Sequence, residues 1–158
     1  MSDLGVLDEG PGLRAQGPVG GHDQVAEERE RYRLAAASSF RDLIAWQKAM
    51  TIAEVVYRLT RTWSRPDQFG LGAQLQRAAV SVPANIAEGF ERRSTREYLR
   101  FLAIACGSLA ECETHLLLAM RIGLQGAERE ELVEQVREVG RILRGIERSL
   151  GRNLGPGP

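Results

Sequence analysis

The feature that most constrains this chain of 158 residues is a spacing of apolar residues at alternating steps of three and four in four of its segments. That spacing puts the apolar side chains on one stripe of an α-helix, which must be buried against other helices. No segment alternates apolar and polar residues with a period of two over a useful length, so strands are not expected. Short connections make neighbouring helices antiparallel. The predicted fold class is therefore all-α: an antiparallel up-down-up-down four-helix bundle with a disordered N-terminal arm and a short C-terminal tail.

Four helices are predicted, at about residues 42–63, 64–88, 94–122 and 127–150. Each has a set of residues expected to face the core. In the first helix these are Leu43, Trp46, Met50, Ala53, Tyr57 and Thr60, and in the second Leu71, Leu75, Ala78, Val82 and Ile86. In the third they are Tyr98, Leu102, Ala105, Leu109, Cys112, Leu116 and Ala119, and in the fourth Leu132, Val136, Val139, Leu143, Ile146 and Leu150.

Capping residues and glycines predict where these helices begin and end. Ser64 is a candidate N-cap with Pro66 in the first turn, where a missing N–H costs nothing. Ser94 and Glu97 have the form of a capping box for the third helix. The second helix is expected to end with Gly89 as a left-handed C-terminal stop.

Three further positions bear on helix shape and packing. Gly123 is expected to end the third helix. Pro83 lies inside the second helix and is expected to kink it without breaking it. Gly107 costs about 1 kcal/mol relative to Ala in mid-helix, and it lies among small residues, so close approach of another helix near Pro83 is expected there.

Composition divides the chain into a bundle and two ends. Residues 1–39 are predicted to be an extension, 40–150 the bundle and 151–158 a flexible tail. The first 24 residues are rich in Gly and Pro and lack apolar periodicity, so they are expected to be disordered, or to be an upstream extension from a misassigned start codon. Residues 25–37 are charged and Ala-rich and suit a marginal helix.

Charge and cysteine usage limit the partners and the compartment. Basic and acidic residues balance at 21 each; the first 39 residues hold four arginines and seven acids, so the rest has 17 basic and 14 acidic residues. This surplus is too small to identify a nucleic-acid binder, but it permits a local basic patch. Cys106 and Cys112 lie six residues apart on one predicted helix, about 9 Å, which is too far for a disulfide. With no signal peptide and no apolar run of about 18 residues, a cytoplasmic protein without a membrane partner is expected.

A polar stripe is predicted beside the apolar one on the second and third helices. Its expected members are Ser81, Asn85 and Glu88 facing Ser108 and Glu111, with Arg77 and His115 at its ends. The functional interpretation is a carboxylate pair, Glu88 with Glu111, for acid–base or metal chemistry. The structural interpretation is a hydrogen-bonded network that fixes helix register, or simply two solvated helix faces. The Glu-x-x-His pairs of carboxylate-bridged metal bundles are absent from the sequence, so the structural interpretation is preferred. We therefore expect no catalytic residue, metal, cofactor or small-molecule substrate.

Two arginine clusters are candidate nucleic-acid contacts. One surrounds the start of the third helix, where exposed N–H groups also favour an anion. The other forms a ridge along the fourth helix, where nearby glutamates at spacings of three or four offer ion pairs as an alternative. The first cluster is Arg92, Arg93, Arg96 and Arg100, and the second is Arg137, Arg141, Arg144 and Arg148.

The order of these motifs resembles a known family. The block at 81–89, Ser-Val-Pro-Ala-Asn-Ile-Ala-Glu-Gly, is followed at 107–109 by Gly-Ser-Leu. It is preceded at 40–43 by Phe-Arg-Asp-Leu, at 46–49 by Trp-Gln-Lys-Ala and at 69–71 by Phe-Gly-Leu. Together these resemble the bacterial four-helix bundle proteins first described as products of intervening sequences in the large-subunit ribosomal RNA gene. The resemblance covers about residues 40–150.

The resemblance implies an up-down-up-down bundle that assembles into a ring, typically a pentamer, without enzymatic activity. The chain is also similar to accessory proteins of diversity-generating retroelements, whose basic rings bind RNA and a reverse transcriptase. The leading hypothesis is therefore a non-enzymatic oligomer that contacts RNA or a ribonucleoprotein partner through its arginine clusters. The alternative is a purely protein-binding scaffold ring.

Overall fold

The computed structural model describes residues 36–92, 94–124 and 129–151. Most of the predicted N-terminal extension, and the predicted tail after residue 151, lie outside the described residues. Within the described ranges all regular structure is helical, in agreement with the predicted all-α class.

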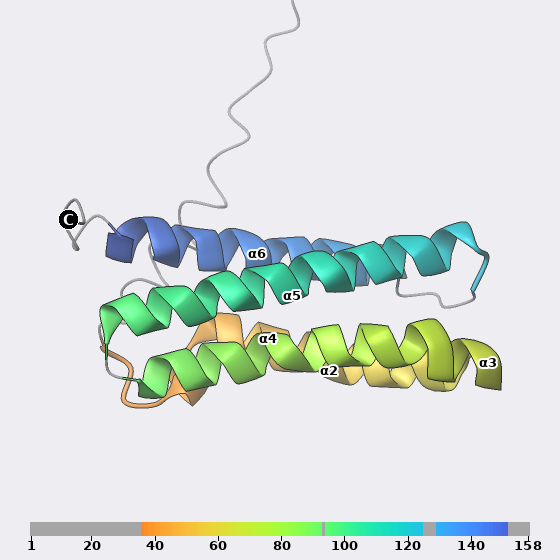
Figure 1. Cartoon of the computed structure of the whole chain (residues 1–158), viewed down its shortest axis with the longest axis horizontal. Helices are drawn as coiled ribbons and strands as arrows, with labels where there is room; N and C mark the ends of the chain where they lie inside the picture. The colour runs from red at the N-terminus through yellow and green to blue at the C-terminus, as the bar shows by residue number, and fades with distance from the viewer. Residues whose placement is uncertain (1–35, 93, 125–128, 152–158) are drawn as a thin grey trace, which may run out of the picture.

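Four long helices form the bundle. They are α2 (Ile44–Arg61), α4 (Ala73–Glu91), α5 (Thr95–Arg121) and α6 (Arg129–Gly151), and three short turns precede them or join them, namely η1 (Phe40–Asp42), α3 (Arg65–Asp67) and the π turn η2 (Gln68–Gly72). The long helices lie side by side along the long axis of the molecule (Figure 1). Helix α4 packs against α2 and α5, and α6 packs against α5 and α2, so the four helices enclose one core.

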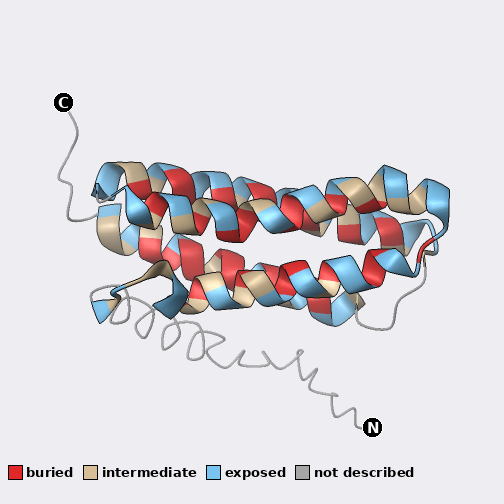
Figure 2. Cartoon of the chain, turned by 90° about the horizontal axis from the view of Figure 1, so that it is seen from below, coloured by how far each residue is buried: buried red, intermediate tan, exposed pale blue. Residues whose placement is uncertain are grey.

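The core-facing stripes of the last three helices agree with the spacing in the sequence (Figure 2). All seven predicted positions of α5 are buried, from Tyr98 to Ala119. All four predicted positions that lie in α4 and five of six in α6 are buried; Leu71, which lies in η2, and Leu150 are half-buried. Burial of each leucine, isoleucine or valine among them stabilises the fold by about 1.5–3 kcal/mol.

The prediction for α2 is wrong at three positions. Trp46 and Met50 are only partly buried and Tyr57 is exposed. The stripe that faces the core is rotated by about one residue and is built from smaller side chains: Ala45, Ala49, Ile52, Val56 and Leu59. Trp46 instead packs edge-on against Phe40, with ring centroids 5.3 Å apart.

The structure confirms three of the predicted helix ends and contradicts a fourth. The Ser64 side chain accepts a hydrogen bond from the Asp67 N–H, and Ser94 accepts one from Glu97. Gly123 has a φ of 79°, the left-handed conformation expected at a helix end. Gly89, however, is buried inside α4, which continues to Glu91, so the predicted stop is wrong.

The predictions for Pro83 and Gly107 concern helix shape and packing. Helix α4 passes through Pro83 without a break. Gly107 lies on the exposed side of α5, and a Cβ placed there would meet no atom within 4 Å, so the expected close approach to another helix of the same chain is wrong.

Helix α5 departs from the expectation that the chain has no long apolar run. By length and composition alone it is apolar enough to cross a membrane. The core helix of a soluble protein passes the same test, and one side of α5 lines the core of this bundle.

Candidate functional site

Three of the predicted polar-stripe residues form a hydrogen-bonded link between α4 and α5. The Ser108 hydroxyl oxygen lies 2.8 Å from that of Ser81. The Asn85 amide donates to the Ser81 carbonyl at 2.7 Å and to the Ser81 hydroxyl at 3.0 Å. Ser108 is buried and the other two are half-buried, so the link lies at the edge of the core. Its geometry suits a role in holding the two helices in register.

The two predicted carboxylates do not join this link. Glu88 is exposed and accepts a hydrogen bond from the Arg92 guanidinium one turn further along the chain. Glu111 is exposed on α5. A carboxylate pair for acid–base work is therefore not assembled here. Among the described residues, no group of three or more His, Cys, Asp or Glu side chains is placed to hold a metal ion.

The first arginine cluster lies where α4 leads into α5. Arg92, Arg96 and Arg100 are exposed, and Arg93 lies outside the described residues. We call the three described members the junction arginines. The guanidinium carbons of Arg92 and Arg100 lie 5.4 and 5.3 Å from the centre of the Phe101 ring, within the range of a cation–π contact. The hydrogen bond to Glu88, and then its charge, raise the pKa of Arg92 above its ordinary value.

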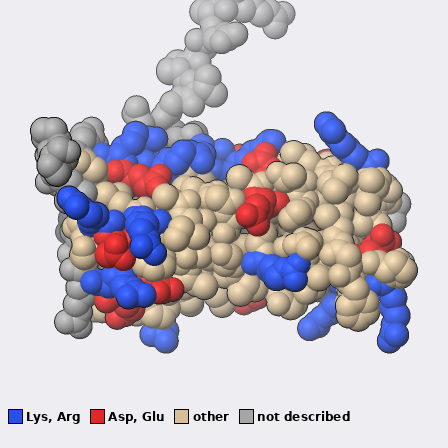
Figure 3. Space-filling view, viewed as in Figure 1, with Lys and Arg blue, Asp and Glu red and all other residues tan. Residues whose placement is uncertain are grey.

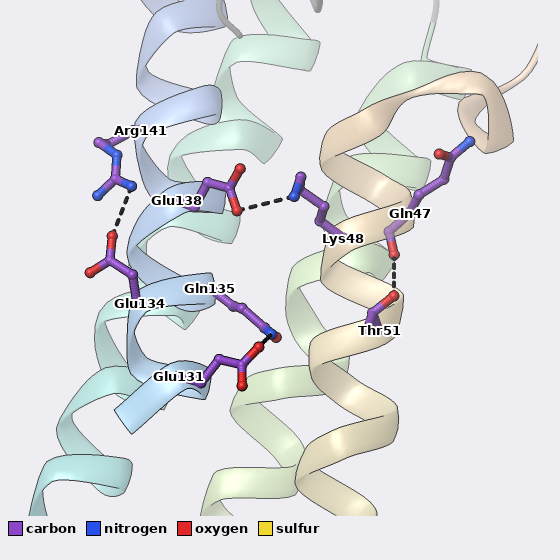
Figure 4. Close-up of polar contacts among 8 residues, drawn as sticks. All are labelled: Gln47, Lys48, Thr51, Glu131, Glu134, Gln135, Glu138 and Arg141. Carbon is purple, nitrogen blue, oxygen red and sulfur yellow. Dashed lines mark hydrogen bonds and ion pairs between the residues drawn. The ribbon is translucent and has the colours of Figure 1, made fainter. Parts of the chain in front are cut away.

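The second cluster, the α6 ridge, consists of Arg137, Arg141, Arg144 and Arg148. Its ion pairs include those of Arg137, whose Nε lies 2.8 Å from Glu113 Oε1 on α5, and of Arg141, whose Nη2 lies 2.9 Å from Glu134 Oε1 on α6. The Arg141–Glu134 pair is drawn in Figure 4, together with the Lys48–Glu138 pair of 3.0 Å that joins α2 to α6. The acidic partners offset much of the charge that the ridge would offer to a phosphate.

The ridge also borders a half-buried thiol. Burial raises the pKa of Cys106 to about 11, with a further contribution from the charge of Glu147, and its sulfur lies 4.0 Å from a Glu147 carboxylate oxygen. Burial likewise raises the pKa of Glu147. The pKa of the buried Cys112 is raised to about 12, again mainly by burial. Neither thiol is activated as a nucleophile, because both pKa values lie well above neutral pH.

A largely uncharged face on α4 and α5 was not anticipated from the sequence. Figure 3 shows few charged side chains in the middle of the face that these two helices present. Four large apolar side chains on the two helices are roughly two-fifths exposed: Val80, Ile104, Leu117 and Leu118. The sequence signal was present, since α5 has apolar residues beyond its core-facing stripe, but helical spacing alone does not say what covers them.

A second unanticipated feature is an acid-poor stretch between Glu54 and Glu88. It contains one acid, Asp67, and four arginines, namely Arg58, Arg61, Arg65 and Arg77. All four arginines are exposed. The local charge was hidden by the balance of the whole chain, and it would have been found by counting charges element by element.

Comparison with known proteins gives one family. The model of the family described as 23S rRNA-intervening sequence protein matches residues 41–145. That range contains the Ser81–Asn85–Ser108 link, the junction arginines and three of the four ridge arginines. No curated protein matches the chain.

Proposed function

Because the chain belongs to the 23S rRNA-intervening sequence protein family, we propose that it is a non-enzymatic helical bundle that acts as an RNA-associated accessory module in the cytoplasm. The family match carries the proposal, since it extends over nearly the whole bundle. The proposed chain path is up-down-up-down, with antiparallel neighbours. The raised thiol pKa values and the separation of Glu88 from the polar link favour a binding role over catalysis.

The module is proposed to act as a homo-oligomer, a pentameric ring in the first instance. The uncharged face of α4 and α5 supports self-association, because Val80, Ile104 and Leu118 leave apolar surface in water. Gly107 lies on the exposed side of α5 with open space beside it, so it would allow a helix of another copy to approach closely.

RNA is proposed to contact the junction arginines and the α6 ridge. Exposed ion pairs such as Arg137–Glu113 are each worth about 0–1 kcal/mol, so a phosphate can compete with the glutamate for the guanidinium. The junction arginines have less acidic competition, because within the described ranges only Arg92 of the three is ion-paired. A ribonucleoprotein or a nucleic-acid-processing enzyme such as a reverse transcriptase would then be the partner that the oligomer serves.

The alternative is a protein-binding scaffold ring with no RNA contact. It is favoured by the same uncharged face and by the glutamates that pair with the ridge. Native mass spectrometry of the full chain purified without nuclease distinguishes the two: an oligomer that retains nucleic acid supports the accessory module, and a bare oligomer supports the scaffold. A bare monomer would contradict both.

The arginine assignment has its own test. In a filter-binding assay with total cellular RNA, changing the four ridge arginines to Gln is expected to weaken retention and its dependence on salt. A matched variant in which Arg92, Arg96 and Arg100 become Gln compares the two clusters. If neither set of substitutions weakens retention of RNA, the two arginine clusters are not the contact surface.

A further inference from the structure

Two exposed aromatic side chains lie close in sequence to the α2–α3 connection. Tyr57, in the penultimate turn of α2, is 41% exposed, and Phe69, in the π turn η2, is 73% exposed. Phe69 is the most exposed of the large apolar side chains in the described part of the chain. An apolar ring held in water has no role in the core, and π turns occur frequently at functional sites.

Three exposed arginines lie between these rings in the sequence, and two of them, Arg61 and Arg65, continue the spacing of the rings. Tyr57, Arg61, Arg65 and Phe69 follow one another at intervals of four. Tyr57 and Arg61 therefore share one face of α2, and Arg65 and Phe69 are one turn apart along the continuous helical segment formed by α3 and η2. We call these four residues the α2–α3 corner.

The positive charge of the corner is not offset as that of the ridge is. No ion pair involves Arg61 or Arg65 within the described ranges. The nearest acid in the sequence, Asp67, has its carboxylate 2.6 Å from the Ser64 hydroxyl, which donates to it at the helix cap. Figure 3 shows basic side chains projecting from the lower right of the molecule, the end at which Figure 1 places α3.

The corner is held in a fixed shape by buried contacts beneath it. The hydroxyl of the buried Thr60 lies 2.9 Å from the Val56 carbonyl oxygen, and it accepts from the Gln76 amide at 2.6 Å, which ties α2 to α4. A Cβ on Gly72 would lie 3.5 Å from the Thr60 side chain, in ordinary van der Waals contact, so η2 packs against α2 at that point. Because these contacts already restrict the corner, less conformational entropy is lost when a ligand binds.

We propose that the α2–α3 corner binds a single-stranded segment of RNA, with one base stacked on Phe69 and the flanking phosphates next to Arg61 and Arg65. Proteins bind single strands through this combination of an aromatic platform and cationic groups along the backbone. A duplex would offer phosphates to the arginines but no free base face to the ring. The inference rests on the proposed RNA association and adds to it a site and a form of RNA.

The test measures binding of the full chain to a fluorescein-labelled oligouridylate of about 20 nucleotides by fluorescence anisotropy, beside a labelled RNA duplex. Phe69→Ala is expected to weaken single-strand binding about five-fold or more, and Phe69→Tyr, which keeps a ring, to restore it. The double variant Arg61→Gln/Arg65→Gln is expected to lower the salt slope of single-strand binding by about 0.7 for each phosphate that an arginine no longer neutralises. Arg137→Gln/Arg141→Gln is the comparison variant, because it removes the same charge from the ion-paired ridge, the other proposed RNA contact, and leaves Phe69, Arg61 and Arg65 in place.

Each outcome has a distinct meaning. If oligouridylate binding is unchanged in Phe69→Ala and in the corner arginine variant but falls in the ridge variant, the corner assignment is wrong and the proposed RNA association stands. If the unmodified chain binds neither single strand nor duplex at low salt, both proposals are wrong. If Phe69→Ala changes the oligomer mass in native mass spectrometry without changing affinity, the ring belongs to a contact between copies and the inference is overturned. Because Phe69 is exposed, the variant is expected to keep the melting temperature of the unmodified protein, which serves as the folding control.

Discussion

Gly89→Ala is expected to destabilise the bundle, although alanine is the better helix former. Gly89 is buried in α4 against α5. A Cβ added there would lie 2.7 Å from the Phe101 Cβ and 3.0 Å from a ring carbon of Tyr98. The Phe101 Cβ is one bond from the α5 backbone, so rotating that side chain cannot relieve the contact. The two helices must move apart, or α5 must shift as a whole.

The magnitude follows from two opposed effects. Replacing Gly by Ala inside a helix contributes about 1 kcal/mol of stability. Overpacking a close-packed contact costs about 1–3 kcal/mol, and a contact made through a backbone-proximal atom belongs near the upper end. The net expectation is a loss of about 2 kcal/mol, which for a bundle of this size lowers the melting temperature by roughly 6–10 °C.

Gly107→Ala is the matched control, because it makes the same substitution in mid-helix with open space around it. It is expected to raise the stability of an isolated chain by about 1 kcal/mol. Thermal and urea denaturation followed by circular dichroism measure both variants. A melting temperature of Gly89→Ala equal to or above that of the unmodified protein would refute the close-packing argument. A Gly107→Ala variant that dissociates the oligomer would show that a second copy fills the open space.

Three further expectations concern stability and reactivity. Asn85→Ala is expected to destabilise by about 1 kcal/mol, because it removes two hydrogen bonds to the half-buried Ser81; an unchanged melting temperature would mean that water replaces the amide. Thr60→Val keeps the side-chain volume but removes the hydroxyl that accepts from Gln76, so a loss of about 1 kcal/mol is expected in urea titration, and a neutral result would show that Gln76 turns to solvent. At pH 8, with a pKa of about 11 at Cys106 and about 12 at Cys112, only about one thiol in a thousand or fewer is ionised. Both should therefore react with iodoacetamide far more slowly than in urea-unfolded protein, and equal rates would contradict the burial.

The sequence predicted the core faces where a single apolar stripe was available. In α5 the positions from Tyr98 to Ala119 repeat at one spacing, and all of them are buried. In α2 two stripes compete. Large side chains at Trp46 and Tyr57 favour one, but the bundle buries the neighbouring stripe that contains Ala45 and Ala49. Small residues let packed helices approach closely. The packing contacts that result depend on the partner helix, which the sequence of α2 alone does not specify.

Gly89 and Glu88 also show that the sequence of one helix does not specify its surroundings. A glycine after the block at 81–88 has the local pattern of a helix end, yet the space for a Cβ is taken by Phe101 and Tyr98, residues that follow on the next helix. Glu88 shares a helical stripe with Asn85, and that spacing alone predicts that both join the polar link. Glu88 is instead exposed and pairs with Arg92 one turn away. The hydrogen bond that crosses between the helices joins two short side chains, Ser81 and Ser108, whereas Asn85 bonds to Ser81 within α4.

The zero net charge of the chain is not evidence against RNA association, because phosphates respond to local charge. Salt reduces the interaction of exposed charges more than about 10 Å apart, so acids on the far side of the bundle contribute little at any one surface. On the α6 ridge, Glu113 and Glu134 pair with arginines directly and reduce the local potential. At the α2–α3 corner, Arg61 and Arg65 have no such partner within the described ranges, and Phe69 adds a contact that depends on the base and not on charge. A surface that combines both contributions should lose only part of its affinity as salt rises, whereas binding through the ridge alone should disappear. Residual binding of the oligouridylate at high salt that depends on Phe69 would therefore separate the two surfaces more sharply than affinity at low salt.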